Sequence, residues 1–354
     1  MKLLSIISIF SILIVVGCSQ NVSGPKGADG NFLNGEYDEA IGAYQKLLEK
    51  NPNDPRVNFM IAESFQKSNR IKLAKGFYET AIENGFDADT ALLHYAFSLK
   101  AHEDYAGAEK QLKAFLERDT IDKYTSRAEK ELANLKYLSD LKTKESFFDV
   151  SDPSAVNTAA AEYSPFISKG ELYFTSNRHD SKIYKTTGTP FTDIYKVKLD
   201  GSSVDLSTIE LLGDLINTPE VNEGTIAFTS DGNTVVFARG NDGSKKGAKE
   251  VNLYISRYRN GSWDEPEYLS INDPDSWDSS PAFNRTGKTL YFASNRQYEG
   301  NMGGIDLYRA TLDANGRFGR PVNLGKEINT PGDEMFPFVA DDGRLLFASS
   351  GHPG

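Results

Sequence analysis

The spacing of apolar residues changes once along the chain, near residue 145. From 31 to 145, alanines and large apolar residues recur at helical spacing, whereas from 146 to 354 short runs of Tyr, Phe, Val and Ile alternate with Asp-Gly, Asn-Gly and Thr-Gly pairs. The first pattern is typical of amphipathic helices, and the second of strands joined by tight turns. The sequence therefore predicts a multidomain protein, with an all-α region followed by an all-β region.

The helical region contains an internal repeat. Three columns recur every 34 residues: Ala40, Ala74 and Ala108; Tyr44, Tyr78 and Leu112; Leu47, Ala81 and Phe115. Small residues at fixed places let paired helices approach closely, while larger ones fill the space between neighbouring hairpins. The segment from Gly35 to Ile41 resembles the turn and second helix of a tetratricopeptide repeat. Residues 31–145 are therefore predicted to form a tetratricopeptide-repeat solenoid, a fold that presents a concave surface to protein segments.

The two ends of this solenoid depart from the repeat. Its first helix would fall at residues 21–34, where Gly24, Pro25 and Gly27 oppose helix formation, so that helix is predicted to be short or missing. Residues 18–30 are rich in Gly, Ser and Asn and are predicted to be a tether. Residues 122–141 carry leucines and an alanine at helical spacing and are predicted to form an amphipathic capping helix.

The β-region repeats three motifs in a fixed order. Asn-Thr-Pro or Asn-Asp-Pro comes first, then a strand, a glycine turn and a second strand, and then Asp-Ile-Tyr or a variant of it. The asparagines are Asn217, Asn272 and Asn329, with a worn copy at Asn157; the third motif begins at Asp193, Asn252 and Asp306. Four short strands in each repeat of this length predict the blades of a β-propeller.

The blades resemble the WD-repeat-like blades of the TolB family, most closely from Ser280 to Tyr308. About three and a half blades fit between residues 146 and 354, so the predicted propeller is incomplete. The fourth copy stops after the strand that ends near Ser349, and we expect the natural chain to continue beyond Gly354.

The N-terminus has the pattern of an export signal. Lys2 precedes an apolar stretch from Leu3 to Val16, and Gly17 directly precedes Cys18. This pattern resembles a bacterial lipobox, which implies removal of residues 1–17 and lipidation of Cys18. The alternative is a membrane-spanning anchor, but a 14-residue apolar stretch, broken only by serines, falls short of the roughly 20 residues that a spanning helix needs. Ser19 resembles the residue that sends such lipoproteins to the outer membrane, facing the periplasm.

Composition narrows the function classes. The net charge of −11 argues against nucleic acid as a partner. A single cysteine excludes a disulfide framework and a Cys-rich metal site. His94 and His102 stand without ligand-spaced neighbours and are predicted to be ordinary helix residues. Metal ligands, catalytic residues and cofactor-binding residues are therefore not predicted, because the familiar hydrolase, zinc-protease and phosphate-loop motifs are also missing from the sequence.

Some residues of the β-region admit two interpretations. Asp193, Asp306 and the Ser-Asn-Arg turns at 176–178 and 294–296 could be ligand groups, but their recurrence from blade to blade favours a structural role in the turns. The loop 272–278 has several oxygen ligands that could hold calcium, and turn chemistry explains it equally well.

The order of lipobox, tetratricopeptide repeats and TolB-like propeller resembles the N-terminal part of Bacteroidetes OmpA-family lipoproteins, including those of the type IX secretion system. That resemblance implies a non-enzymatic outer-membrane scaffold that binds envelope or secretion-system proteins. It also implies a tether to peptidoglycan through a C-terminal OmpA-like domain that this sequence does not include. The alternative is a glycan-binding or hydrolytic propeller of the periplasm.

Overall fold

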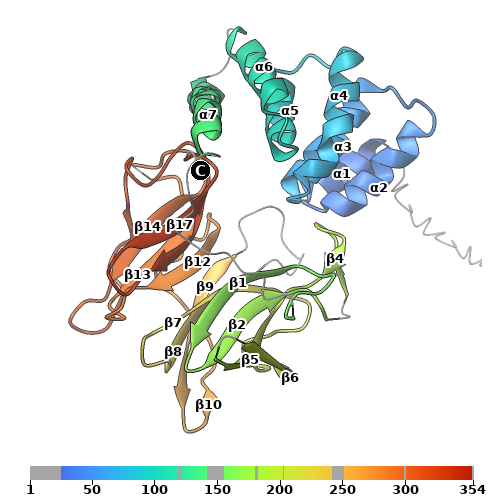
Figure 1. Ribbon diagram of the computed structural model, residues 1–354. Helices are drawn as coiled ribbons and strands as arrows, with labels where there is room; N and C mark the ends of the chain where they lie inside the picture. Colours follow the sequence, from blue (N-terminus) through green and yellow to red (C-terminus); the bar gives the residue numbers. More distant parts are fainter. Residues whose placement is uncertain are drawn as a thin grey trace, which may run out of the picture.

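A computed structural model describes residues 25–118, 122–141, 155–179, 182–201, 203–240, 251–298 and 300–352. A helical domain lies above a β-domain, and the chain passes from one to the other once (Figure 1). Cys18 and residues 1–17 lie outside the described residues, as does the predicted domain boundary at 145 and 146. Within the described ranges, no helix combines the length and the apolar character needed to cross a bilayer.

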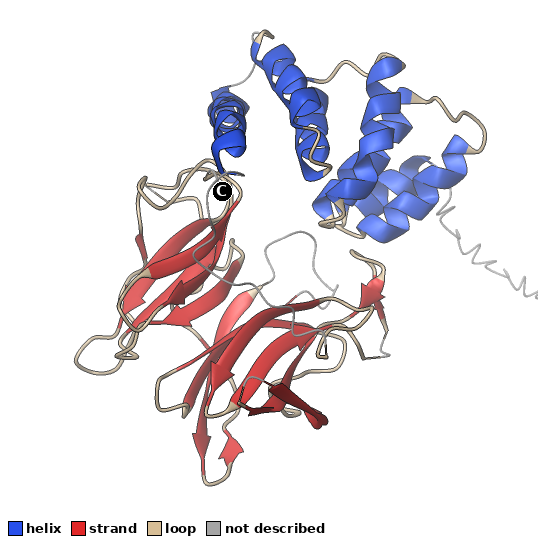
Figure 2. Ribbon diagram, in the orientation of Figure 1, coloured by secondary structure: helices blue, strands red, loops and turns tan. Residues whose placement is uncertain are grey.

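The helical domain consists of antiparallel helix pairs that stack side by side (Figure 2). Its elements are α1 (Pro25–Leu33), α2 (Tyr37–Leu48), α3 (Pro55–Lys67), the 3₁₀ turn η1 (Ile71–Ala74), α4 (Lys75–Glu83), α5 (Asp89–Ala101), α6 (Tyr105–Leu116) and α7 (Asp122–Leu141). Ala40 and Ala74 are fully buried and Ala108 is 1% exposed, so the predicted alanine column does lie between helices. Asp54 caps α3 by accepting from the Val57 amide, with Pro55 at the first helical position.

The start of the helical domain differs from one prediction. The last residues of the predicted tether, Pro25 to Gly30, belong to α1, which is a short first helix. Proline is tolerated there because it occupies the first turn, where its missing N–H has no helical partner. Ala28 is fully buried at the position equivalent to Ala62, 34 residues later, and this contact holds the helix on α2 and α3. At the other end, α7 has the bounds predicted for the capping helix.

Among the described residues, the β-domain forms four blades in chain order, three sheets of at least four strands and one hairpin, and a second hairpin lies outside the blades (Figures 1 and 2). Blade one is β1 (Glu162–Ser168), β2 (Glu171–Ser176), β5 (Asp193–Asp200) and β6 (Ser203–Leu211). Blade two is β7 (Asn222–Phe228), β8 (Thr234–Gly240), β9 (Asn252–Arg259) and β10 (Ser262–Trp263), with β11 (Glu267–Tyr268) also paired to β9. Blade three is β12 (Asp278–Phe283), β13 (Thr289–Ser294), β14 (Asp306–Thr311) and β15 (Val322–Asn323). Blade four is β16 (Glu334–Val339) and β17 (Leu345–Ser349).

The first strand of each blade is its innermost strand. β12 packs against β7 and β16, and β1 packs against β7, so the four sheets are arranged around one side of a common axis. Apolar clusters fill the space between neighbouring blades, with Phe228 and Phe237 between blades one and two, and Phe292 between blades two and three. The predicted fold class, an all-α repeat domain followed by an all-β domain of propeller blades, is therefore confirmed.

A small hairpin between β2 and β5 reaches the helical domain. It is formed by β3 (Ile183–Tyr184) and β4 (Thr189–Pro190). The Asp38 amide donates to the Lys185 carbonyl at 3.0 Å, and Thr186 Oγ1 donates to the Gly35 carbonyl at 2.7 Å. At the opposite end, Asn134 of α7 donates to the carbonyl of Gly351 beside blade four at 2.8 Å. The helical domain therefore contacts the propeller at two separate places.

Candidate functional site

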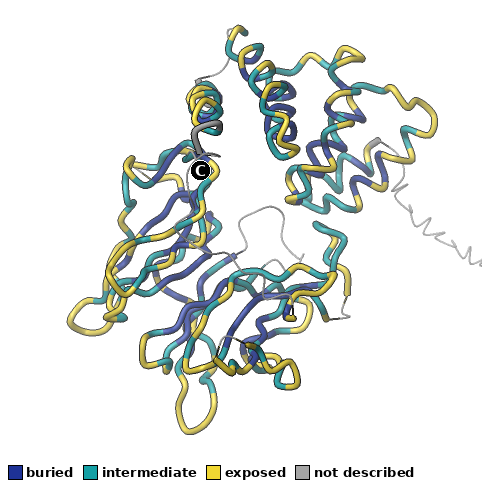
Figure 3. The backbone as a smooth tube through the Cα atoms, in the orientation of Figure 1, coloured by how far each residue is buried: buried dark blue, intermediate teal, exposed yellow. Residues whose placement is uncertain are grey.

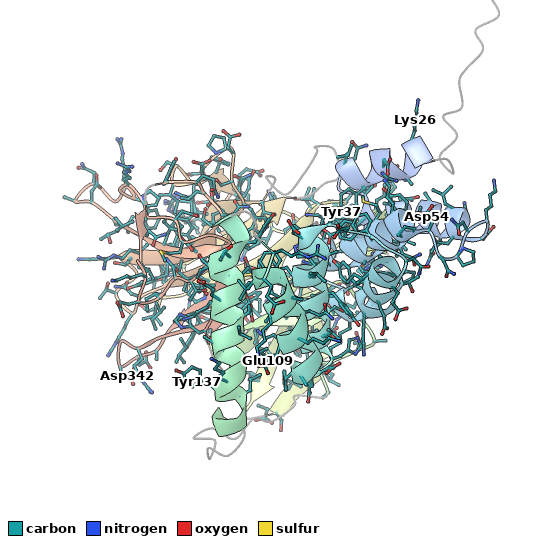
Figure 4. All side chains as sticks on the ribbon, turned by 90° about the horizontal axis from the view of Figure 1, so that it is seen from above. Lys26, Tyr37, Asp54, Glu109, Tyr137 and Asp342 are labelled. Atoms are coloured by element: carbon teal, nitrogen blue, oxygen red, sulfur yellow. The ribbon has the colours of Figure 1, made fainter. Side chains whose placement is uncertain are left out.

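A cavity of about 550 Å³ lies between the helical domain and the innermost strands of the blades. One wall is the turn after α3, formed by Ser68, Asn69 and Arg70. The others come from the hairpin β3–β4 and from β1, β7, β12 and β16. Seen from above, the helices spread across the blades from Lys26 on α1 to Tyr137 on α7 (Figure 4). We call this space the interdomain cavity.

The innermost strands share one backbone irregularity. Ser164, Thr225, Ser280 and Phe336 all have positive φ, at 57°, 21°, 52° and 51°. In each blade this residue lies where the pairing register shifts, which marks a β-bulge. Such a backbone conformation is uncommon for residues other than glycine, and a bulge redirects the local side chains. Three of the four bulge residues line the interdomain cavity: Thr225, Ser280 and Phe336.

Hydroxyl groups meet at the bulges of blades two and three. Thr225 Oγ1 lies 3.0 Å from Ser279 Oγ and accepts from the Ser280 amide at 3.0 Å. Ser280 Oγ is buried and has no hydrogen-bond partner among the described residues. The cavity wall therefore includes a hydroxyl whose hydrogen-bonding capacity the described part of the chain does not use.

The asparagines of the Asn-Thr-Pro and Asn-Asp-Pro motifs have a structural role. Asn217 Oδ1 accepts from the Ile194 amide at 2.8 Å, and its Nδ2 donates to the Ile194 carbonyl at 3.0 Å. Asn272 makes the same pair of bonds to Leu253, and Asn329 makes it to Leu307. Each partner is the middle residue of an Asp-Ile-Tyr-type motif, so the first and third repeated motifs bind each other. We call this arrangement the asparagine clamp.

The arginines at or just after the ends of the second strands form ion pairs inside their own blades. Arg178 pairs with Glu162 at 2.9 Å, Arg239 with Glu223 at 3.0 Å, and Arg296 with Asp278 at 2.6 Å. Each acidic partner is the first or second residue of an innermost strand. Each guanidinium also lies over an aromatic ring, about 5 Å from the centroids of Phe174, Phe237 and Phe292. These contacts support the structural interpretation of the Ser-Asn-Arg turns.

Blade four replaces the arginine with a histidine. Arg296 Nη2 donates to the Ile271 carbonyl, and His352 Nε2 lies 2.8 Å from the equivalent carbonyl, that of Ile328. The His352 ring also packs edge-on against Phe347, as the arginines pack on their phenylalanines. His352 therefore occupies, in blade four, the place that Arg296 occupies in blade three.

Of the two aspartates weighed as ligands, Asp306 is bonded within the fold through one oxygen, and its Oδ1 is buried without a hydrogen-bond partner among the described residues. Asp306 Oδ2 accepts from the Met302 amide at 2.9 Å and from Asn323 Nδ2 at 2.7 Å, and burial raises the pKa of Asp306. Burial also raises the pKa of Asp193. In the loop 272–278, Asp273 accepts from the Asp275 amide and from Ser276 Oγ. Turn chemistry therefore occupies the loop that the sequence offered for calcium, and the described residues contain no cluster with the composition of a metal site.

The two helical histidines have separate environments. His94 Nδ1 lies 2.6 Å from Glu63 Oε1, and Tyr78 donates to the same oxygen at 2.8 Å. Burial alone would raise the pKa of Glu63, but the hydrogen bond and charge of His94, with the Tyr78 bond, outweigh it and lower that pKa. His102 Nε2 lies 2.7 Å from the Lys72 carbonyl, on a different part of the solenoid.

The carboxylate at the cavity wall has an unusual environment. Glu223 is fully buried on β7, and this burial raises its pKa to about 8 against the opposing charge of Arg239.

The sequence did not predict the interdomain cavity, because residues as far apart as 68 and 336 form its walls. The recurring Ser-Pro or Phe-Pro pair on the innermost strand, as at Ser280-Pro281, is the one signal that marks the bulges.

Comparisons with known proteins agree with the helical architecture. The tetratricopeptide-repeat family matches residues 32–93. A search of curated proteins finds no match. Among solved structures, the first tetratricopeptide domain of Spaghetti (RPAP3), bound to an HSP90 peptide, is 20% identical, with 33% of this chain and 90% of that chain covered and a TM-score of 0.29. The Yersinia enterocolitica type III secretion chaperone SycD, in complex with a YopD peptide, is 21% identical, with 33% of this chain and 89% of that chain covered and a TM-score of 0.29.

The β-domain is similar to propeller-containing structures at low identity. A putative TolB from Agrobacterium tumefaciens is 14% identical, with 51% of this chain and 50% of that chain covered and a TM-score of 0.32. A puromycin-hydrolysing peptidase from Mycobacterium tuberculosis is 14% identical, with 54% of this chain and 28% of that chain covered and a TM-score of 0.34. The blade assignment rests on the sheet order and motif contacts described above.

Proposed function

We propose that this protein is a non-enzymatic, lipid-anchored scaffold of the outer membrane that binds other envelope proteins at the periplasmic face. The observation that carries the proposal is the use of the repeated polar motifs. The asparagine clamps and the buried arginine pairs hold the strands and turns of individual blades in place, so these residues are committed to architecture. A binding function is therefore left to the exposed surfaces of the two domains. Tetratricopeptide repeats present a concave surface suited to protein segments.

Anchoring is proposed from the N-terminal sequence. Gly17 and Cys18 follow an apolar stretch of export-signal length, and several acyl chains on one cysteine would hold the protein stably on a bilayer. Ser19 supports the outer membrane as the destination. The resemblance to OmpA-family lipoproteins supports a finer proposal, in which the scaffold ties a secretion machine of the type IX kind to the cell wall.

Two measurements test the scaffold. The full chain is expressed with its signal, and the Cys18→Ala variant is compared with Ser19→Ala in fractionated cells. We expect the Cys18→Ala protein to leave the membrane fraction while the Ser19→Ala protein remains bound to membrane. Retention of the Cys18→Ala protein would contradict lipid anchoring.

The second measurement is co-purification of the wild-type protein from detergent-solubilised outer membrane. We expect specific recovery of envelope proteins, among them integral β-barrels or components of a secretion complex. A monodisperse protein recovered alone, with turnover of a polysaccharide or peptide, would replace the scaffold with an enzymatic function.

A further inference from the structure

The interdomain cavity has the size and composition of a small-molecule site. Its 550 Å³ falls within the roughly 300–1,000 Å³ of ligand pockets. Four aromatic side chains line it, from four different elements: Tyr163, Tyr184, Trp277 and Phe336. Serine and threonine hydroxyls and asparagine amides form most of the polar remainder. These groups both donate and accept hydrogen bonds, whereas aromatic faces pack on C–H surfaces.

The described lining offers no unpaired charge. Its two charged residues are each in an ion pair, Glu223 with Arg239 at 3.0 Å and Arg70 with Asp38 at 2.6 Å. Each also keeps one buried atom, Glu223 Oε2 and Arg70 Nη2, without a hydrogen-bond partner among the described residues. Against the described lining, a charged ligand would lose its hydration without gaining a free counter-charge, and that cost disfavours it. The cavity therefore fits a neutral ligand that has both polar and apolar faces.

The bulges determine how such a ligand is held. The innermost strand of each blade is an edge strand, and an unbroken edge would recruit an extended peptide by strand addition. Here the bulges at Thr225, Ser280 and Phe336 interrupt the edge and redirect their side chains at the cavity. The bulges therefore favour recognition by side chains over backbone pairing. Because an extended peptide would bind by backbone pairing, the bulges disfavour a peptide ligand.

We propose that the interdomain cavity binds a neutral saccharide. The aromatic side chains would pack on the C–H faces of sugar rings, and the hydroxyl and amide groups would bond the sugar hydroxyls. The buried Ser280 hydroxyl, which is without a partner among the described residues, supplies unused capacity at the wall. This site is separate from the scaffold function and does not depend on it.

The same lining favours binding over hydrolysis. Glycoside hydrolysis ordinarily needs two carboxyl groups on either side of the bond that is cleaved. Glu223 supplies the single carboxyl group among the described lining residues, and Arg239 and the Thr218 amide both donate to its Oε1. The saccharide is therefore expected to leave the cavity unchanged.

The test is isothermal titration calorimetry of the full chain with N,N′-diacetylchitobiose and cellobiose, two neutral disaccharides. An uncharged tetrapeptide and a uronic-acid disaccharide serve as the contrasting probes. We expect saturable binding of at least one neutral disaccharide and none of the contrasting probes. Binding of the peptide or of the acidic sugar in preference, or of no disaccharide at millimolar concentration, would overturn the proposal.

Two pairs of variants locate the site. Phe336→Ala and Ser280→Ala are expected to weaken binding by about tenfold, equivalent to about 1.4 kcal/mol each. Their controls are Phe338→Ala, an exposed phenylalanine on the same strand, and Ser164→Ala, the bulge serine of blade one, neither of which lines the cavity. Ser280→Ala should leave the unfolding midpoint unchanged, because its hydroxyl makes no bond to the described chain. Equal loss in a variant and its control would contradict the location.

Discussion

Arg296 and Asp278 form an ion pair inside blade three, with 2.6 Å between Nη2 and Oδ1. The two residues are 1% and 0% exposed, so both charges are removed from water. The guanidinium also lies 5.0 Å from the Phe292 ring centroid and 5.1 Å from that of Tyr308. Because a buried charge is costly unless it is paired, each member of this pair depends on the other.

Removing the arginine should destabilise the propeller strongly. We expect Arg296→Ala to lower the free energy of unfolding by about 3–5 kcal/mol, because Asp278 would remain buried without a counter-charge. Urea denaturation measures it through tryptophan fluorescence, since both tryptophans, Trp263 and Trp277, lie in the β-domain. The exposed Arg309 on β14 gives the control, and Arg309→Ala should change stability by less than about 0.5 kcal/mol. Equal effects of the two substitutions would contradict the role of the pair.

Removing one asparagine clamp should also lower the free energy of unfolding, by less than the loss of Arg296 does. Asn217→Ala removes one bond to the Ile194 amide and one to the Ile194 carbonyl, and leaves both groups buried. We expect about 2 kcal/mol of lost stability, from the bonds and from the unsatisfied backbone. Asn217→Asp keeps the acceptor but places a carboxylate against the carbonyl, so it should not restore stability. The exposed Asn233→Ala is the control, and a loss as large in that variant would exclude the clamp as the cause.

The sequence predicted those features that repeat. The alanine column marked the helix contacts because the same small residue is required wherever two helices cross closely, at Ala40, Ala74 and Ala108. The recurrence of Asn217 and its equivalents likewise marked the blades, although the partner of Asn217, a backbone residue 23 positions earlier, could not be read from the sequence.

Features that occur once carried no such signal. The contact of Asp38 with Lys185 joins residues from two domains, and nothing periodic accompanies it. The interdomain cavity depends on that contact, since Asn69 and Arg70 reach it only when the solenoid is docked. The residue type of Phe336 does not favour its positive φ, so the following Pro337 is the one sign of that bulge in the sequence.

The Glu63–His94 pair makes the helical domain sensitive to acid. The pKa of Glu63 is lowered in the folded protein, so its stabilising contribution is present above the unfolded value of 4.5 and is lost as the pH falls through the folded value. Glu63→Gln should cost about 2 kcal/mol near neutral pH, and the difference from wild type should shrink as the pH falls below about 4.5. Thermal unfolding followed by far-UV circular dichroism measures it. The exposed Glu129→Gln should show no such trend, and a pH-independent gap for Glu63→Gln would contradict the linkage.

Docking of the hairpin on the solenoid depends on Gly188. Its φ is +72°, and a Cβ there would lie 2.5 Å from the Asp38 carboxyl group. Turning that carboxylate away would break its bond from Arg70, which is 2.6 Å long. Gly188→Ala should therefore break the bond from the Asp38 amide to the Lys185 carbonyl. Gly201 has a similar φ of +62° with open space around it, so Gly201→Ala carries the same backbone strain, about 1–2 kcal/mol, without the collision.

Amide hydrogen exchange at Asp38 distinguishes the two variants. In the wild type this amide is bonded across the domains at 3.0 Å, and it should be protected from exchange for as long as the hairpin stays docked. We expect Gly188→Ala to accelerate its exchange by at least about tenfold, whereas Gly201→Ala leaves the rate near that of the wild type. If both variants accelerate exchange equally, backbone strain in the β-domain would explain the effect. If neither does, the hairpin stays docked despite the added Cβ, and that result would contradict the role of Gly188.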